Sequence, residues 1–125
     1  MGGDLAGTWR LESWTIHDQD GTVWDPLGEE GTGVAVVAAE GWLSVHITLE
    51  EPVQVAANQA ATYVDYVGRY RLDGDRLVTT VEISSISDWV GTEQARDVEL
   101  TADTMVLRLP TGGGVRHELR WRRIA

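Results

Sequence analysis

Short runs in which apolar and polar residues alternate, separated by tight turns, are the feature that most constrains how this chain folds. Alternation with a period of two indicates a strand that buries one face, because successive side chains of a strand point to opposite sides. The runs are bounded by glycine- and aspartate-containing pairs that favour turns. The strands predicted in this way cover residues 8–17, 33–39, 42–49, 63–72, 76–85, 90–100, 104–109 and 115–123.

One segment departs from this pattern. Residues 53–62 contain four alanines, and their helix propensity predicts one short helix of one to three turns. Eight antiparallel strands joined by short turns lose their exposed edges by closing into a barrel that can hold one small ligand. We therefore predict an all-β fold, an eight-stranded antiparallel up-and-down barrel with one short helix. The length of 125 residues fits a single domain over residues 1–125.

Charge and composition exclude several classes of function. Twenty acidic residues against ten basic ones give a net charge of −10, which makes nucleic acid and membrane surfaces poor partners. All the basic residues are arginines, so no lysine amine is present for Schiff-base chemistry. With no cysteine, the chain forms neither disulfides nor thiolate sites. Residues 1–4 lack the basic start of a signal peptide, so we expect a cytoplasmic protein.

The common catalytic and cofactor motifs are also missing. The histidines His17, His46 and His117 do not have the spacing of metal ligands, so we expect no metal. The glycines Gly112–Gly114 join two predicted strands and indicate a hairpin loop rather than a phosphate-binding loop. No serine lies in a nucleophile elbow, which argues against Ser/His/Asp catalysis. We therefore expect no cofactor.

The two ends of the chain are predicted to meet. Alternation places His117, Leu119, Trp121 and Arg123 on the inward face of the last strand, because the charged residues between them must face water. The guanidinium of Arg123 is then positioned to stack on Trp9 and to seal one end of the barrel. A Gly-x-Trp on the first strand with an inward arginine on the last is the lipocalin signature.

The wider pattern resembles the small bacterial and fungal lipocalin-like domain family. The resemblance is carried by residues 5–11, 33–44, 66–70, 89–96 and 119–123, of which Trp-Val-Gly-x-x-Gln-x-Arg is the most specific motif. It implies the barrel fold, and it implies a place in secondary metabolism because members occur in gene clusters of that kind. The chain departs from the family pattern where it has Val37 in place of a tyrosine, Thr79 and Thr80 in place of a histidine, and Ser87 in place of a proline.

The strand 90–100 carries the most informative polar residues. Its acidic residues share one face, which must be solvated, so Gln94 and Arg96 are predicted to point into the barrel. A buried guanidinium needs a partner, and Glu82 on the neighbouring strand is the natural candidate. Two interpretations stay open. Arg96 is either half of a structural ion pair or a group that orients a carbonyl or enolate of a ligand.

Aromatic residues supply the rest of the predicted pocket. Indole and phenol rings combine flat apolar area with one polar group, which suits a lumen for a conjugated, partly polar molecule. His117 is the better candidate for a general acid or base, because it shares the inward face with Trp121. We predict Arg96, Gln94, Glu82, Tyr66 and His117 as catalytic residues, and Tyr70, Trp14, Trp42, His46, Trp89 and Leu72 as ligand contacts.

Two functions remain open at this stage. In the first, the barrel is a cofactor-free cyclase, pericyclase or isomerase of polyketide-type metabolism, which folds a hydrophobic substrate inside its lumen. In the second, it is a binder that carries, sequesters or senses a hydrophobic small molecule. The sequence also leaves open whether the chain is a monomer or a homodimer.

Overall fold

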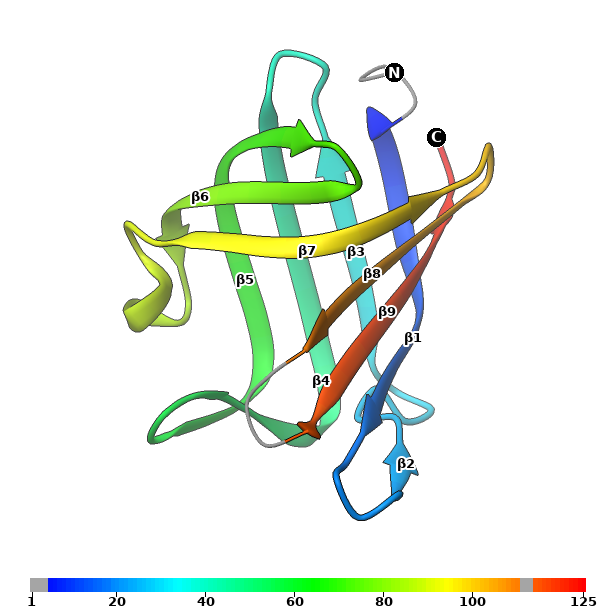
Figure 1. Ribbon diagram of the computed structural model, residues 1–125, viewed down its shortest axis with the longest axis vertical. Coiled ribbons are helices and arrows are strands. Elements are labelled where there is room, and N and C mark those ends of the chain that lie inside the picture. Colours follow the sequence, from blue (N-terminus) through cyan, green and yellow to red (C-terminus); the bar gives the residue numbers. More distant parts are fainter. Residues whose placement is uncertain (1–4, 111–113) are drawn as a thin grey trace.

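Each long strand pairs antiparallel with the next one along the chain, and the last strand returns to pair with the first, so the sheet closes into a barrel (Figure 1). The computed structural model describes residues 5–110 and 114–125. The predicted loop at Gly112–Gly114 and the N-terminal residues 1–4 thus lie wholly or partly outside the described residues. The strands are β1 Gly7–His17, β2 Val23–Trp24, β3 Thr32–Val37, β4 Trp42–Ala56, β5 Gln59–Asp73, β6 Arg76–Ser84, β7 Glu93–Leu100, β8 Thr104–Pro110 and β9 Arg116–Arg123.

The eight long strands confirm the predicted up-and-down barrel, and the two-residue strand β2 adds to the edge of β1. The helical content differs from the prediction. In the described residues the only assigned helix longer than a single residue is the 3₁₀ turn η1, Ser87–Trp89, between β6 and β7. None of the described helical residues belongs to a helix long and apolar enough to cross a membrane.

The predicted helix at residues 53–62 is wrong, because this segment is a β-hairpin. β4 continues through it to Ala56, and β5 begins at Gln59, with Val53 paired to Ala61. Val53 is buried, and Val53 and Val55 lie on the same face of the strand. The burial of this face outweighs the helix propensity of the alanines. The hairpin lies at the end of the barrel opposite the chain termini (Figure 1), and it brings both valines to the wall of a cavity.

A β-bulge in β1 changes which residues face inward. Leu11 pairs with Trp121 and Ser13 pairs with Arg120, so Glu12 is an extra residue in the ladder. Before the bulge Trp9 and Leu11 are buried, and after it Trp14 and Ile16 are buried. An uninterrupted alternation over residues 8–17 would place Trp14 and Ile16 on the face opposite to Trp9, and the bulge turns them inward.

The chain ends seal one end of the barrel, as predicted. The guanidinium carbon of Arg123 lies 4.3 Å from the ring centroid of Trp9, and Arg123 Nη1 donates a hydrogen bond of 2.7 Å to the carbonyl of Ala6. The Trp9 indole in turn donates a hydrogen bond of 3.0 Å to the carbonyl of Leu5. Trp9 and Leu5 are fully buried, so this end is filled by side chains and any cavity must lie towards the other end.

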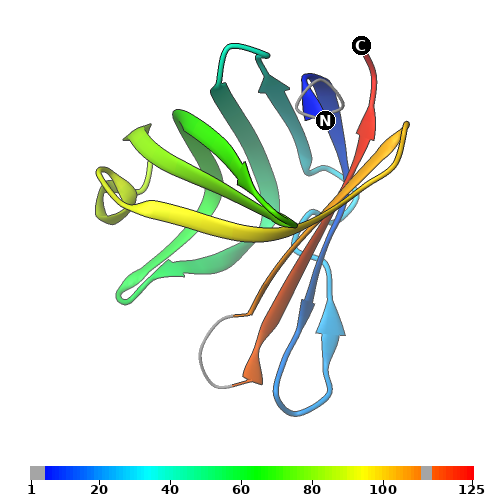
Figure 2. The ribbon, with the colours of Figure 1, turned by 45° about the horizontal axis from the view of Figure 1, so that its top comes forward.

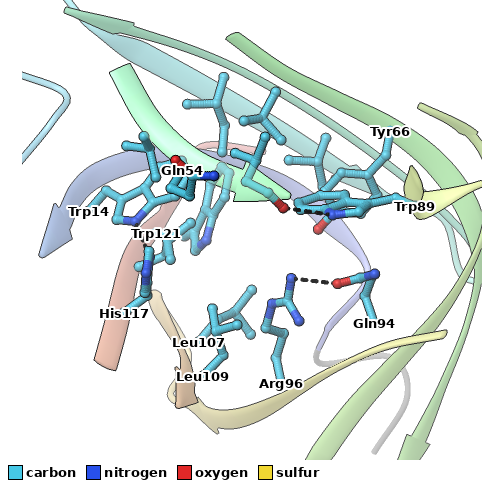
Figure 3. Close-up of a pocket in the computed structure, with 16 residues that line it drawn as sticks. Trp14, Gln54, Tyr66, Trp89, Gln94, Arg96, Leu107, Leu109, His117 and Trp121 are labelled. Atoms are coloured by element: carbon cyan, nitrogen blue, oxygen red, sulfur yellow. Dashed lines mark hydrogen bonds between the residues drawn. The ribbon is translucent and has the colours of Figure 1, made fainter. Parts of the chain in front are cut away.

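Strand β7 changes partners along its length. Its first part, from Glu93, pairs with β6, and only Asp97–Leu100 pair with β8. Figure 2 shows β7 and β8 separating towards η1. Gln94 and Arg96 lie on the part of β7 that has left β8, so their side chains reach the interior beside the inner ends of β8 and β9 (Figure 3).

Candidate ligand-binding site

The interior of the barrel contains a cavity of about 160 Å³. Most of its wall is apolar or aromatic, and its polar groups come from β4, β5, β7 and β9 (Figure 3). Leu107 and Leu109 of β8 belong to this wall, and the alternation in residues 104–109 was a signal that would have found them. The lining residues are Trp14, Val45, Ile47, Val53, Gln54, Val55, Val64, Tyr66, Trp89, Gln94, Arg96, Leu107, Leu109, His117, Leu119 and Trp121.

A second cavity of about 590 Å³ lies nearer the open end of the barrel. Trp24 and Val115 line it, together with the end of the β4–β5 hairpin. Both cavities share Val53, Gln54, Val55 and His117 as lining residues. This second cavity is therefore the mouth of the inner one.

Arg96 and Gln94 lie at the inner cavity, as the alternation of their strand predicted. Arg96 Nη2 donates a hydrogen bond of 3.2 Å to Oε1 of Gln94, and Nη1 donates one of 3.0 Å to the carbonyl of Ala95. Both partners are neutral. Burial lowers the pKa of Arg96, and the electrostatic interaction with Tyr66 opposes that effect.

Glu82 does not pair with Arg96. Its side chain is about half exposed and lies 3.9 Å from Arg69 on the outer face of the barrel. The register of β5 against β6 shifts between Val67 and Gly68, where a Cβ on Gly68 would meet the carbonyl oxygen of Thr80. In the described residues no carboxylate lies within ion-pair distance of Arg96, so the predicted ion pair between Arg96 and Glu82 does not form.

Tyr66 and Trp89 close one side of the cavity. Their rings meet edge to face, with centroids 5.7 Å apart, and the Trp89 indole donates a hydrogen bond of 3.2 Å to the carbonyl of Val55. This contact attaches η1 to the hairpin end of β4. Burial raises the pKa of Tyr66, and the charge of Arg96 partly offsets the rise. The Tyr66 hydroxyl is therefore a neutral donor at the cavity.

Trp14 and His117 form a polar contact on the side of the cavity opposite to Tyr66 and Trp89. The Trp14 indole nitrogen donates to Nδ1 of His117 at 3.0 Å. Because an indole N–H only donates, Nδ1 must be unprotonated, and the neutral ring carries its proton on Nε2. Burial and the charge of Arg96 lower the pKa of His117, while Asp18 opposes the shift. His117 is thereby held as a donor through Nε2, so of its two predicted roles, general acid or general base, the hydrogen bond disfavours the base.

Trp121 was not predicted as a site residue, although its inward face was. Its side chain is 1% exposed, and its indole nitrogen is a buried donor with no hydrogen-bond partner in the described structure. A buried donor that lacks a partner is unfavourable, and in native proteins such groups often mark a site for water or a ligand.

The remaining predicted contacts lie elsewhere. Trp42 is 37% exposed and stacks under Arg69 on the outer face. Leu72 is equally exposed, near the β5–β6 turn. Tyr70 packs in the interior, but its hydroxyl donates to the carbonyl of Ala38 at 2.9 Å and it does not line the inner cavity.

His46 also lies on the outer face, within a hydrogen-bonded relay. Its Nδ1 lies 2.9 Å from a carboxylate oxygen of Asp65, and its Nε2 lies 2.7 Å from Oγ of Ser44. The order resembles a Ser/His/Asp triad, which the sequence analysis did not expect. The relay sits on a sheet surface with the His46 side chain 56% exposed. No water-excluding cleft or oxyanion hole surrounds it in the described structure, so the relay lacks the main source of hydrolytic catalysis.

A metal centre is not assembled by these groups. Within residues 5–110 and 114–125, no cluster of three or more histidine, aspartate or glutamate side chains is placed to hold a metal ion.

An eight-stranded up-and-down barrel with a cavity towards one end belongs to the class of barrels that enclose small ligands. Within this class, the chain belongs to the lipocalin-like domain family, whose model matches residues 6–124. The match covers the whole barrel and confirms the resemblance seen in the sequence. A comparison with curated proteins finds no match.

Solved structures share the fold at low sequence identity. A lipocalin-like protein from Bacteroides uniformis is 18% identical with a TM-score of 0.54, and the alignment covers 98% of this chain and 100% of that one. A protein from Bacteroides eggerthii is 19% identical with a TM-score of 0.51, covering 95% and 98%. A de novo designed fluorescence-activating β-barrel is 14% identical with a TM-score of 0.51, covering 98% and 96%. These similarities establish the fold alone.

Proposed function

We propose that this protein binds one hydrophobic, partly polar small molecule in the lumen of its barrel. The observation that supports the proposal is the inner cavity, which has apolar walls and a few fixed polar groups, the usual composition of a small-molecule site. Gln94 and Arg96 hold each other in place and would orient the polar part of the molecule. The shared lining residues lead us to expect that the ligand extends from the inner cavity into the mouth.

A neutral fluorescent hydrophobe, N-phenyl-1-naphthylamine, tests this binding site. We expect its emission to rise on titration with the protein, and we expect energy transfer from Trp14, Trp89 and Trp121 at one probe per chain. Leu107→Phe and Val64→Phe each add bulk to a different cavity wall and should weaken probe binding about tenfold or more. Ile83→Phe is the control, because Ile83 is 68% exposed on the outside of the barrel.

The binding proposal is wrong if the wild-type protein binds neither this probe nor an anionic probe with the same aromatic skeleton. It is also wrong if a folded variant with a filled cavity binds the probe as tightly as the wild-type protein. Folding of each variant is checked by its circular dichroism and melting temperature.

For catalysis, we propose a cofactor-independent cyclase of the pericyclic type rather than an isomerase that moves protons. Proton transfer needs a base, but His117 Nδ1 already accepts from Trp14, and in the described structure no carboxylate lines the inner cavity and Asp18 lies only at its mouth. A pericyclic closure needs only a folded substrate and hydrogen-bond donors that polarise its carbonyl. Arg96 and the Tyr66 hydroxyl are such donors.

A linear triene that carries a ketone and closes by an intramolecular Diels–Alder reaction tests the catalytic proposal. Two C–C bonds form, three π bonds become one, and no atom is gained or lost. We expect wild-type protein to accelerate closure and Arg96→Leu to lose most of that acceleration. If the triene binds but closes at the uncatalysed rate, the carrier or sensor is the better assignment, and the lack of a base in the described lining favours that alternative.

A further inference from the structure

We infer that the ligand of this lumen is an organic oxyanion, such as a carboxylate or an enolate, that acts as the missing counter-ion of Arg96. The inference rests on the proposed binding of a small molecule in the lumen and adds the chemical class of that molecule. It also assigns a second acceptor on the ligand, or a second oxygen of the same group, to the indole N–H of Trp121.

The distribution of ion pairs is the first argument. Five arginines on the outer face of the barrel have carboxylate partners even though water already solvates them. Arg96, at the inner cavity, has only the neutral oxygens of Gln94 and Ala95 as partners in the described structure. A buried charge without a counter-ion is unfavourable, so an anion that enters beside Arg96 gains more than it would at the surface. The outer pairs are Arg69–Glu82, Arg71–Glu93, Arg76–Asp97, Arg108–Glu99, Arg108–Glu118 and Arg122–Glu12.

The second argument is the excess of donors at the cavity. The Trp121 indole nitrogen is buried and has no partner in the described structure. His117 presents Nε2–H because Trp14 occupies Nδ1, and no hydrogen bond engages the Tyr66 hydroxyl among the described residues. The amide oxygen of Gln94 already accepts from Arg96. The lining therefore offers several donors to a ligand and few acceptors, which matches an acceptor-rich group such as an oxyanion.

The charge of Arg96 also acts across the cavity. It partly offsets the rise that burial causes in the pKa of Tyr66 on β5, and it adds to the lowering that burial causes in the pKa of His117 on β9. In the described structure no aspartate or glutamate lines the inner cavity, and Asp18 lines only its mouth, although the whole chain carries a net charge of −10. The inner cavity is therefore positive inside an acidic exterior. Because that exterior repels anions, tight binding of an anionic probe would have to come from the lumen.

Two probes with the same aromatic skeleton test the inference. The first, 1-anilinonaphthalene-8-sulfonate, carries an oxyanion, and the second, N-phenyl-1-naphthylamine, is neutral. We expect the wild-type protein to bind the sulfonate about tenfold more tightly than the neutral probe at constant ionic strength, the size of effect that a charge-assisted hydrogen bond provides.

The following variants test whether the preference for the sulfonate comes from Arg96 and Trp121. Arg96→Met keeps the aliphatic stem, removes the charge and should abolish the preference, with Arg96→Gln as a second variant should Arg96→Met not fold. Arg120→Met removes the same charge from an exposed position on β9 and should change either affinity by no more than about twofold. Trp121→Phe removes only the unpartnered N–H and should weaken the sulfonate by about threefold to tenfold while the neutral probe is unaffected.

The outcomes separate this inference from the proposed function. If the neutral probe binds as tightly as the sulfonate, or if the preference survives removal of the Arg96 charge, the oxyanion assignment is overturned while lumen binding stands. If neither probe binds the wild-type protein, both the binding site and the assignment built on it fail.

Discussion

The indole N–H of Trp14 donates to Nδ1 of His117 across 3.0 Å, and this contact sets the protonation of the imidazole. The two residues lie on adjacent strands, β1 and β9. A second proton on His117 would have to occupy Nδ1, where it would face the indole proton. Protonation of His117 therefore breaks the hydrogen bond and also charges a group at a lumen that already holds the Arg96 cation.

This relationship predicts a pH dependence of stability. The pKa of His117 is lowered by burial and by Arg96, whereas in the unfolded chain a histidine titrates at about 6.5. As the pH falls below that value the unfolded chain takes up a proton that the folded chain does not. The unfolded state then binds more protons, and the free energy of unfolding decreases until the pH reaches the folded pKa.

The measurement is urea unfolding at about pH 7.5 and about pH 5 for the wild-type protein and His117→Gln. Glutamine keeps an acceptor for Trp14 but does not titrate. We expect the wild-type protein to lose more stability between the two values than the variant loses. Equal losses would show that His117 titrates alike in both states.

A second prediction concerns the sealed end of the barrel. Arg123→Ala should lower the free energy of unfolding by about 1–3 kcal/mol, because it removes the stacking on Trp9 together with the packing of the side-chain stem. The free energy of unfolding of Arg123→Lys should lie between those of the wild-type protein and Arg123→Ala, since lysine keeps the charge but loses the planar group. Denaturant unfolding measures the effect. A variant as stable as the wild-type protein would contradict a stabilising role for the stacked pair.

A third prediction concerns the stability role of Arg96. With Glu82 on the outer face, Arg96→Leu leaves no buried carboxylate unpaired. We expect the variant to fold with a melting temperature no lower than that of the wild-type protein, because an uncompensated buried charge is replaced by an apolar side chain. A loss of about 3–5 kcal/mol would instead be the signature of a broken internal ion pair.

A fourth prediction concerns the Ser44–His46–Asp65 relay. A fluorophosphonate probe labels serines that are activated by histidine and supported by an oxyanion hole. We expect no labelling of Ser44 above the level of Ser44→Ala, as measured by intact-protein mass spectrometry, because the relay is exposed on a sheet surface. Stoichiometric labelling would establish a nucleophile on the outer face and would reopen hydrolysis as a function.

The fold was predictable because alternation and turn residues recur along most of the chain. Two departures were not predictable from local pattern. The segment 53–62 has alanines that favour a helix in isolation, but pairing with β5 and burial of Val53 determine its strand conformation. The bulge at Glu12 depends on the fit between β1 and β9, and the residues around it carry no sequence signal that would predict a bulge.

The site was predictable where one face of a strand is strongly acidic. Glu93, Asp97 and Glu99 had to face water, which turned Gln94 and Arg96 inward. The same logic, applied to the apolar set Leu43, Val45 and Ile47 on β4, requires the intervening residues of that strand to face outward. The partners of Arg96 could not be read from alternation, because they depend on how β5, β6 and β7 align.

Because of the extra residue at Glu12, the inward-facing residues of β1 have odd numbers before the bulge and even numbers after it. Substitutions at Trp14 and Ile16 can reshape the lumen, while the contact between Trp9 and Arg123 stays in place. Removal of Glu12 would take out the extra position and leave Ser13 opposite Arg120, so Trp14 and Ile16 would still face the lumen. Continuous pairing with Glu12 retained would instead exchange inside for outside along the second half of the strand and would replace the indole and isoleucine with Ser13 and Thr15. A loss of one residue at this position is therefore a change that barrels of this kind could accept without altering either their sealed end or the lumen-facing residues of their first strand.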